Sequence, residues 1–109
     1  MNVERGYKGE PKTKAERKWL SEVIQMVNFM QDSGTWSENI CQITVKDNGD
    51  LVMIPRQGKE RFLFGPPSGF ESKFDRIGRY YTTILPEKGA GFYSIVNVKY
   101  NGQIVCRKQ

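Results

Sequence analysis

The spacing of apolar residues follows a helical period first and a strand period later in the chain. Behind a polar lead-in over residues 1–12, apolar side chains recur three and four positions apart as far as Gly34, which predicts an amphipathic helix. Thr13 and Glu16 fit a capping box at its start, where each side chain satisfies a free backbone donor of the other. The expected apolar stripe of this helix is Trp19, Leu20, Val23, Ile24, Val27 and Met30.

Alternation of apolar and polar residues begins at Cys41 and predicts a β-hairpin that turns at Asn48-Gly49. Asn-Gly supplies the left-handed backbone that both central residues of a two-residue type I′ turn require. Such a turn puts four β-forming side chains on one face, which favours this register. The expected pairs are Val45 with Val52 and Ile43 with Ile54.

The second half of the chain predicts a strand and a second helix. Residues 61–64 form the strand, which Gly65-Pro66-Pro67 ends. Ser68 and Glu71 fit another capping box, and the helix that they open is terminated by Pro86 and Gly89. Its expected apolar stripe is Phe70, Phe74, Ile77, Tyr81 and Ile84.

The last segment predicts another hairpin, with Asn101-Gly102 as a two-residue turn between residues 93–100 and 103–107. The expected pairs are Val98 with Val105 and Lys99 with Ile104.

The predicted order of elements is therefore α-β-β-β-α-β-β, which is typical of an α+β fold. Hairpins of this kind predict an antiparallel or mixed sheet of about five strands, with two helices packed on one face. The chain has 109 residues, enough for one hydrophobic core, and we assign residues 13–109 to a single domain.

Positive charge is concentrated near the start of the chain, where six of the 17 basic residues lie in the first 18 positions. A weak basic segment can attract nucleic acid or an anionic membrane, but it is more typical of a solvated linker. Rings and cations also mix near Arg76, Arg79, Tyr80 and Tyr81, and again at Tyr93, Lys99 and Tyr100. Nucleic-acid binders show such a mixture, although a charged helix face explains the same pattern. A small basic nucleic-acid-binding domain is therefore an alternative function.

The sequence offers little for catalysis, because it contains no histidine, the commonest general base and metal ligand. Cys41 and Cys106 have no metal-binding spacing, and we expect two small buried side chains rather than a disulfide. Residues 65–69 lead into a helix N-terminus, but their two prolines remove the backbone donors that a phosphate cradle uses. We therefore expect no enzyme activity, cofactor, metal or small-molecule substrate.

One binding feature with a physical mechanism is the last strand, over residues 103–107. If this strand lies at the edge of the sheet, its N–H and C=O groups can accept a strand from a partner. Arg107 and Lys108 would then guard the edge against indiscriminate pairing. The sequence leaves open whether the strand is an edge or an internal strand.

Four short motifs resemble one protein family in their order and spacing, with Glu71 and Lys73 on the helix after the first motif. They are Phe62-Leu63-Phe64-Gly65, Gly91-Phe92-Tyr93-Ser94, Val96-Asn97-Val98-Lys99-Tyr100 and Gly102-Gln103-Ile104-Val105-Cys106. Over residues 14–106 the chain resembles the C-terminal region of FtsQ/DivIB-type bacterial cell-division proteins. It departs from that pattern at Asn97, where many members have Asp, and at Arg107, where the family has an aromatic residue.

The resemblance implies a non-enzymatic divisome scaffold that acts in septum formation. It implies a position on the outer, periplasmic face of the bacterial inner membrane, behind a single membrane helix and a further domain, so we expect the chain to be a piece of a longer protein. The implied partners are FtsB-like and FtsL-like division proteins, bound by strand addition. An envelope-assembly domain with another partner is a further alternative. The implied partner-binding residues are Lys99, Tyr100, Gly102, Gln103, Ile104, Val105 and Cys106.

Overall fold

The computed structural model describes residues 2–4, by their backbone alone, and residues 14–108. The helices are α1 (Lys14–Ser33), α2 (Thr35–Asn39), α3 (Phe70–Arg79) and α4 (Leu85–Lys88), with a π-helical segment η1 (Tyr80–Ile84) between the last two. The strands are β1 (Asn2–Glu4), β2 (Ile40–Val45), β3 (Leu51–Pro55), β4 (Arg61–Gly65), β5 (Ile95–Asn97) and β6 (Val105–Arg107). The α+β class and the predicted order of the main elements are confirmed.

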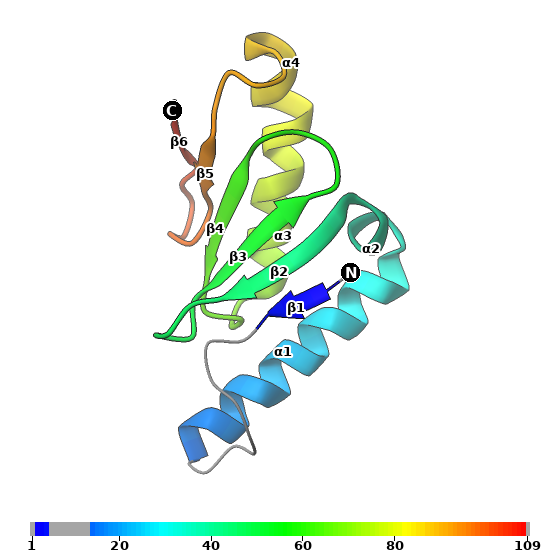
Figure 1. Ribbon diagram of the computed structural model, residues 1–109, viewed down its shortest axis with the longest axis vertical. Helices are drawn as coiled ribbons and strands as arrows, with labels where there is room; N and C mark the ends of the chain where they lie inside the picture. Colours follow the sequence, from blue (N-terminus) through cyan, green and yellow to red (C-terminus); the bar gives the residue numbers. More distant parts are fainter. Residues whose placement is uncertain (1, 5–13, 109) are drawn as a thin grey trace.

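The described strands form one mixed sheet of six strands in the order β1-β2-β3-β4-β5-β6 (Figure 1). The pairs β1–β2 and β4–β5 are parallel and the other pairs are antiparallel. Parallel pairing of β4 with β5 requires a crossover, which α3, η1 and α4 provide. β1 lies within the segment that we expected to be an irregular lead-in, and the predicted capping residue Thr13 lies outside the described residues.

The first hairpin is present, but its predicted register is wrong by one residue. Val45 lies opposite Leu51, and the N–H of Lys46 donates to the C=O of Asp50 at 2.9 Å, so residues 47–49 form the loop. Only Gly49 has a positive φ there, 87°, whereas a type I′ turn needs one at Asn48 as well. The loop is therefore longer than predicted, and Val45 does not pair with Val52 or Ile43 with Ile54.

The slip reverses the two faces of β3, because neighbouring residues of a strand point to opposite sides of the sheet. Leu51 and Met53 face the core instead of Val52 and Ile54. The second hairpin shows the same error, since Asn97 rather than Val98 lies opposite Val105, and residues 98–104 form a loop. The predicted pair of Lys99 with Ile104 is therefore wrong as well.

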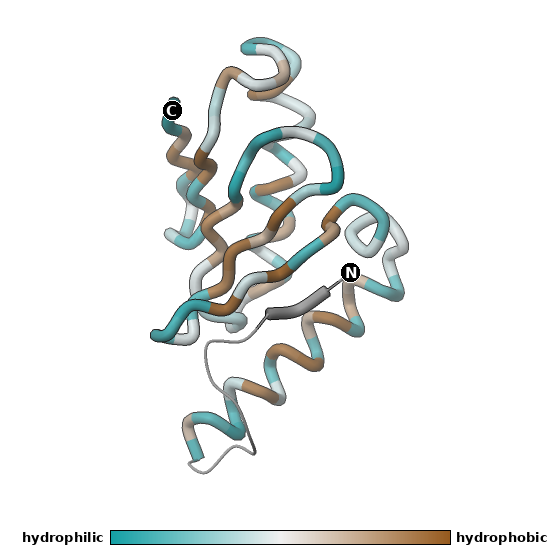
Figure 2. Tube along the Cα trace, viewed as in Figure 1, coloured by the Kyte–Doolittle hydropathy of each residue, from teal (hydrophilic) through white to brown (hydrophobic). Residues whose placement is uncertain are grey.

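The core lies between one face of the sheet and the two long helices. Phe74 of α3 contacts Phe64 of β4, with ring centroids 5.0 Å apart, and Phe29 of α1, at 5.7 Å. Both helices therefore pack on the same face, as predicted. Figure 2 shows the apolar residues of the central strands and the mid-section of α1 in brown. The largest fully buried side chains include Tyr80, Phe62, Phe64, Phe74, Met26 and Met30.

The α1 stripe is shifted slightly from its predicted position. Met26, which we did not include, is fully buried, whereas Ile24, which we did, is 52% exposed. The buried stripe follows Val23, Met26 and Met30, and Trp19, Val27 and Phe29 pack against the core beside it.

The start of the second helical region and the role of Pro86 differ from the prediction, whereas the region ends at Gly89 as predicted. Gly69, with a φ of 65°, caps α3 and no side chain bonds to the cap, so the predicted capping box of Ser68 and Glu71 is wrong. In η1 the N–H of Leu85 donates to the C=O of Tyr80, a five-residue spacing. The helix then restarts with Pro86 in the first turn of α4, where a missing N–H costs little.

Candidate functional site

β6 forms one edge of the described sheet. One side of β6 pairs with β5, and no strand among the described residues pairs with its other side (Figure 1). The C=O of Arg107 faces β5, where it accepts from the N–H of Ser94 at 2.9 Å. Because backbone polar groups alternate sides along an antiparallel strand, those of Cys106 face the open side. β6 can therefore accept a further strand, which the sequence had left open.

Residues 98–104 form a loop beside this edge, and they carry most of the predicted site. Tyr100 is 54% exposed, and the Nζ of Lys99 lies 5.5 Å from the centre of its ring. The N–H of Gln103 donates to the C=O of Tyr100 at 3.2 Å, and Gly102 supports this turn with a φ of 73°. The loop thus presents an exposed aromatic ring with a cation beside it, and Lys99 itself lies against Gly65 of β4.

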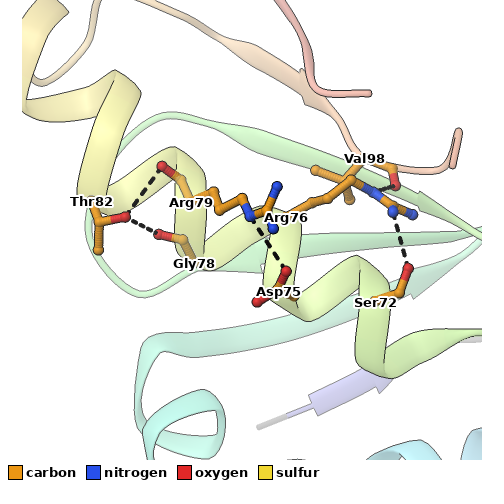
Figure 3. Close-up of polar contacts among 7 residues, drawn as sticks. All are labelled: Ser72, Asp75, Arg76, Gly78, Arg79, Thr82 and Val98. Atoms are coloured by element: carbon orange, nitrogen blue, oxygen red, sulfur yellow. Dashed lines mark hydrogen bonds and ion pairs between the residues drawn. The ribbon is translucent and has the colours of Figure 1, made fainter. Parts of the chain in front are cut away.

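The start of this loop is fixed by α3, as Figure 3 shows. Arg76 donates from Nε to the C=O of Val98 at 2.9 Å and from Nη1 to the Oγ of Ser72 at 2.9 Å. The N–H of Val98 in turn donates to the C=O of Leu63 at 3.0 Å. Sequence reasoning missed Arg76 in this role. Its only signal is its position immediately before Ile77, at the border of the buried stripe.

The remaining residues of the predicted site are either exposed to solvent or packed against the core. Val105 is 38% exposed on the open face of the sheet, and Gly102 and Gln103 are exposed. Ile104 and Cys106 are half-buried and pack against the core, so they offer a partner their backbone rather than their side chains. Burial raises the pKa of the Cys106 thiol.

The mixture of rings and cations over residues 76–81 does not form a stacking surface. Tyr80 and Arg76 are buried, and Arg79 pairs with Asp75 at 3.4 Å (Figure 3). The exposed charged face of α3 therefore lacks the solvent-facing rings that single-stranded nucleic acid needs for stacking.

Other types of site are not found in the described part of the chain. No three His, Cys, Asp or Glu side chains there are grouped so that they could hold a metal ion. None of the described helices combines the length and the apolar character needed to cross a bilayer. Cys41 and Cys106 lie on different strands, β2 and β6, as free thiols.

A family model described as "FtsQ/DivIB, C-terminal related" matches residues 8–107. The chain belongs to this family. The match covers nearly the whole sequence and confirms the resemblance carried by the motifs. No curated protein matches the chain. This FtsQ/DivIB-related domain is a bacterial cell-division domain, and its family is of the division-scaffold type rather than a known enzyme family.

Proposed function

We propose that the FtsQ/DivIB-related domain is a non-enzymatic divisome scaffold that binds FtsB-like or FtsL-like division proteins during septum formation. Binding occurs by addition of a partner strand to β6. The observation that carries this proposal is the open side of β6, and the loop that leads into β6 carries the exposed ring of Tyr100.

The surroundings of β6 support a partner segment of a particular kind. Main-chain hydrogen bonds at Cys106 supply affinity without sequence preference, and side chains then determine which strand is accepted. The exposed side chain of Val105 offers apolar contact, while Arg107 and Lys108 add positive charge. An extended segment with alternating apolar residues and acidic flanks complements this edge.

The proposal includes a place in the cell, on the basis of the family. We propose that the domain acts on the outer, periplasmic face of the inner membrane, held there by a single membrane helix in a longer protein. The association of the FtsQ/DivIB family with bacterial division supports this position.

The first test is a calorimetric titration of the chain with the outer segment of the FtsB-like protein from the same source. Tyr100→Ala is expected to weaken binding by about 1–3 kcal/mol, because aromatic side chains dominate interface energetics. The matched control is Ile24→Ala, which truncates another exposed apolar side chain on α1, away from β6.

Saturable binding that Tyr100→Ala weakens and Ile24→Ala leaves unchanged supports the proposed site. Equal affinities for the two folded variants would remove Tyr100 from the interface. No binding to the folded native chain would contradict the proposed partner.

A further inference from the structure

A second polar site lies behind the loop of residues 98–104, between that loop and the first turn of α3. A cavity of about 360 Å³ opens there, and we call it the α3 pocket. Its polar lining consists of Ser68, Ser72, Lys73, Arg76, Lys99 and Asn101. No carboxylate lines it, whereas three of these side chains are cationic.

Two of the three cations are buried and have no carboxylate at ion-pair distance among the described residues. Lys73 is 6% exposed and donates to the C=O of Pro66 at 2.5 Å, with its Nζ 5.2 Å from the centre of the Phe64 ring. Arg76 is 8% exposed, and its partners are the neutral oxygens of Val98 and Ser72.

Burial of an unpaired charge is costly, and an anion in the pocket would offset that cost. The pKa of Lys73 agrees with this, since it is lowered first by burial and then by the neighbouring Arg76. Asp50 and Glu22 act on Lys73 in the opposite direction, but they do not line the pocket.

The pocket also contains unused hydrogen-bond donors. A guanidinium has five N–H groups and an ammonium has three. Arg76 uses two of its N–H groups and Lys73 uses one in the hydrogen bonds described above, so several N–H groups of both side chains are still available. Ser72 accepts from Arg76 through Oγ, which leaves its own hydroxyl proton to donate. Pro66 has no N–H, so recognition comes from these side chains rather than from a backbone cradle.

We propose that the α3 pocket binds a tetrahedral phosphate-type oxyanion. Several donors that line one pocket, with net positive charge and no acidic side chain, match the several acceptor oxygens of a phosphate. The phosphate comes either from a soluble phosphomonoester or from a lipid headgroup. The pocket shares Lys99 with the predicted partner-binding residues but lies apart from the open side of β6, and its test uses phosphate instead of the division partner.

The test is a titration of the full chain with inorganic phosphate, followed by amide resonances at an ionic strength held constant with sodium chloride. We expect saturable shifts at Ser68–Lys73 and at residues 98–101. Lys99→Gln is expected to weaken the affinity about tenfold, because it removes one charge-assisted hydrogen bond. The control, Lys88→Gln on α4, makes the same charge change outside the pocket.

Arg76 is left in place because it holds the carbonyl of Val98, and Ser72→Ala serves as the second variant. Ser72→Ala preserves the charge and should also weaken phosphate binding. Two results would overturn the proposal: resonance shifts spread over all surface cations, or equal losses of phosphate affinity in Lys88→Gln and Lys99→Gln. Either result would mean that phosphate only screens the positive charge of the surface in general. Saturable binding of acetate at these residues without binding of phosphate would overturn the ligand class.

The source of the phosphate is distinguished with vesicles of phosphatidylcholine, with and without phosphatidic acid. Sedimentation of the chain with the phosphatidic acid vesicles, lost in Lys99→Gln and retained in Lys88→Gln, supports a lipid headgroup. Binding of inorganic phosphate without sedimentation supports a soluble phosphomonoester.

Discussion

At the residue scale, the most constrained polar contact in the core joins Tyr80 to Glu60. The hydroxyl of Tyr80 donates to the Oε2 of Glu60 at 2.7 Å, both side chains are buried, and the Oε1 of Glu60 has no hydrogen-bond partner in the structure. Tyr80→Phe should therefore leave a buried carboxyl without a donor. We expect the free energy of unfolding to fall by about 1–3 kcal/mol, measured by chemical denaturation.

Tyr81→Phe is the matched control, since its ring also packs on Phe62 but its hydroxyl does not bond to Glu60 in the structure. Equal stability of the two variants would contradict this role for the Tyr80 hydroxyl.

At the element scale, β6 allows a test of strand addition that is independent of side chains. Cys106→Pro removes the N–H that faces the open side while sparing the bonds that β6 makes with β5. We expect this variant to lose partner binding in the calorimetric titration, whereas Cys106→Ala, which keeps the N–H, should bind like the native chain. Circular dichroism checks that both variants fold. A folded Cys106→Pro variant with native affinity would contradict strand addition at β6.

The elements also show how far the sequence could predict this fold and this site. Both hairpins, both long helices and their order were predictable, because apolar periodicity and Asn-Gly turns depend on local chemistry. The registers were not, because Asn48-Gly49 is compatible both with a two-residue turn and with a longer loop in which only Gly49 is left-handed. Motif resemblance placed the proposed partner site on the last hairpin. It could not separate the exposed Val105 from the half-buried Cys106, because that distinction depends on register.

At the scale of the whole molecule, the buried phenols predict a loss of stability in alkali. Burial and then the hydrogen bond to Glu60 raise the pKa of Tyr80, and burial and Glu60 raise that of Tyr81 to about 12. In the unfolded chain a tyrosine titrates at about 10, so the folded state holds these protons more tightly. The contribution of these protons to the free energy of unfolding is complete below about pH 10 and is lost as the pH rises through the folded-state pKa values.

We expect the free energy of unfolding to fall between about pH 10 and 12, with a smaller dependence on pH in the double variant Tyr80→Phe/Tyr81→Phe. An unchanged slope in the double variant would contradict this assignment.

The strand order of the sheet has a consequence for how the domain opens. Each described strand pairs only with its neighbours in the chain, so β5 and β6 are attached to the rest of the sheet through β4 alone. The terminal hairpin can therefore open as a local unit while β2, β3 and β4 stay paired, at the cost of exposing the buried Val96 and Val98 and of breaking the bond from Arg76 to Val98. A partner that binds only the closed hairpin pulls this equilibrium toward the closed form by mass action. Partner affinity and protection of the β5 amides from hydrogen exchange then both depend on the equilibrium between the open and the closed hairpin.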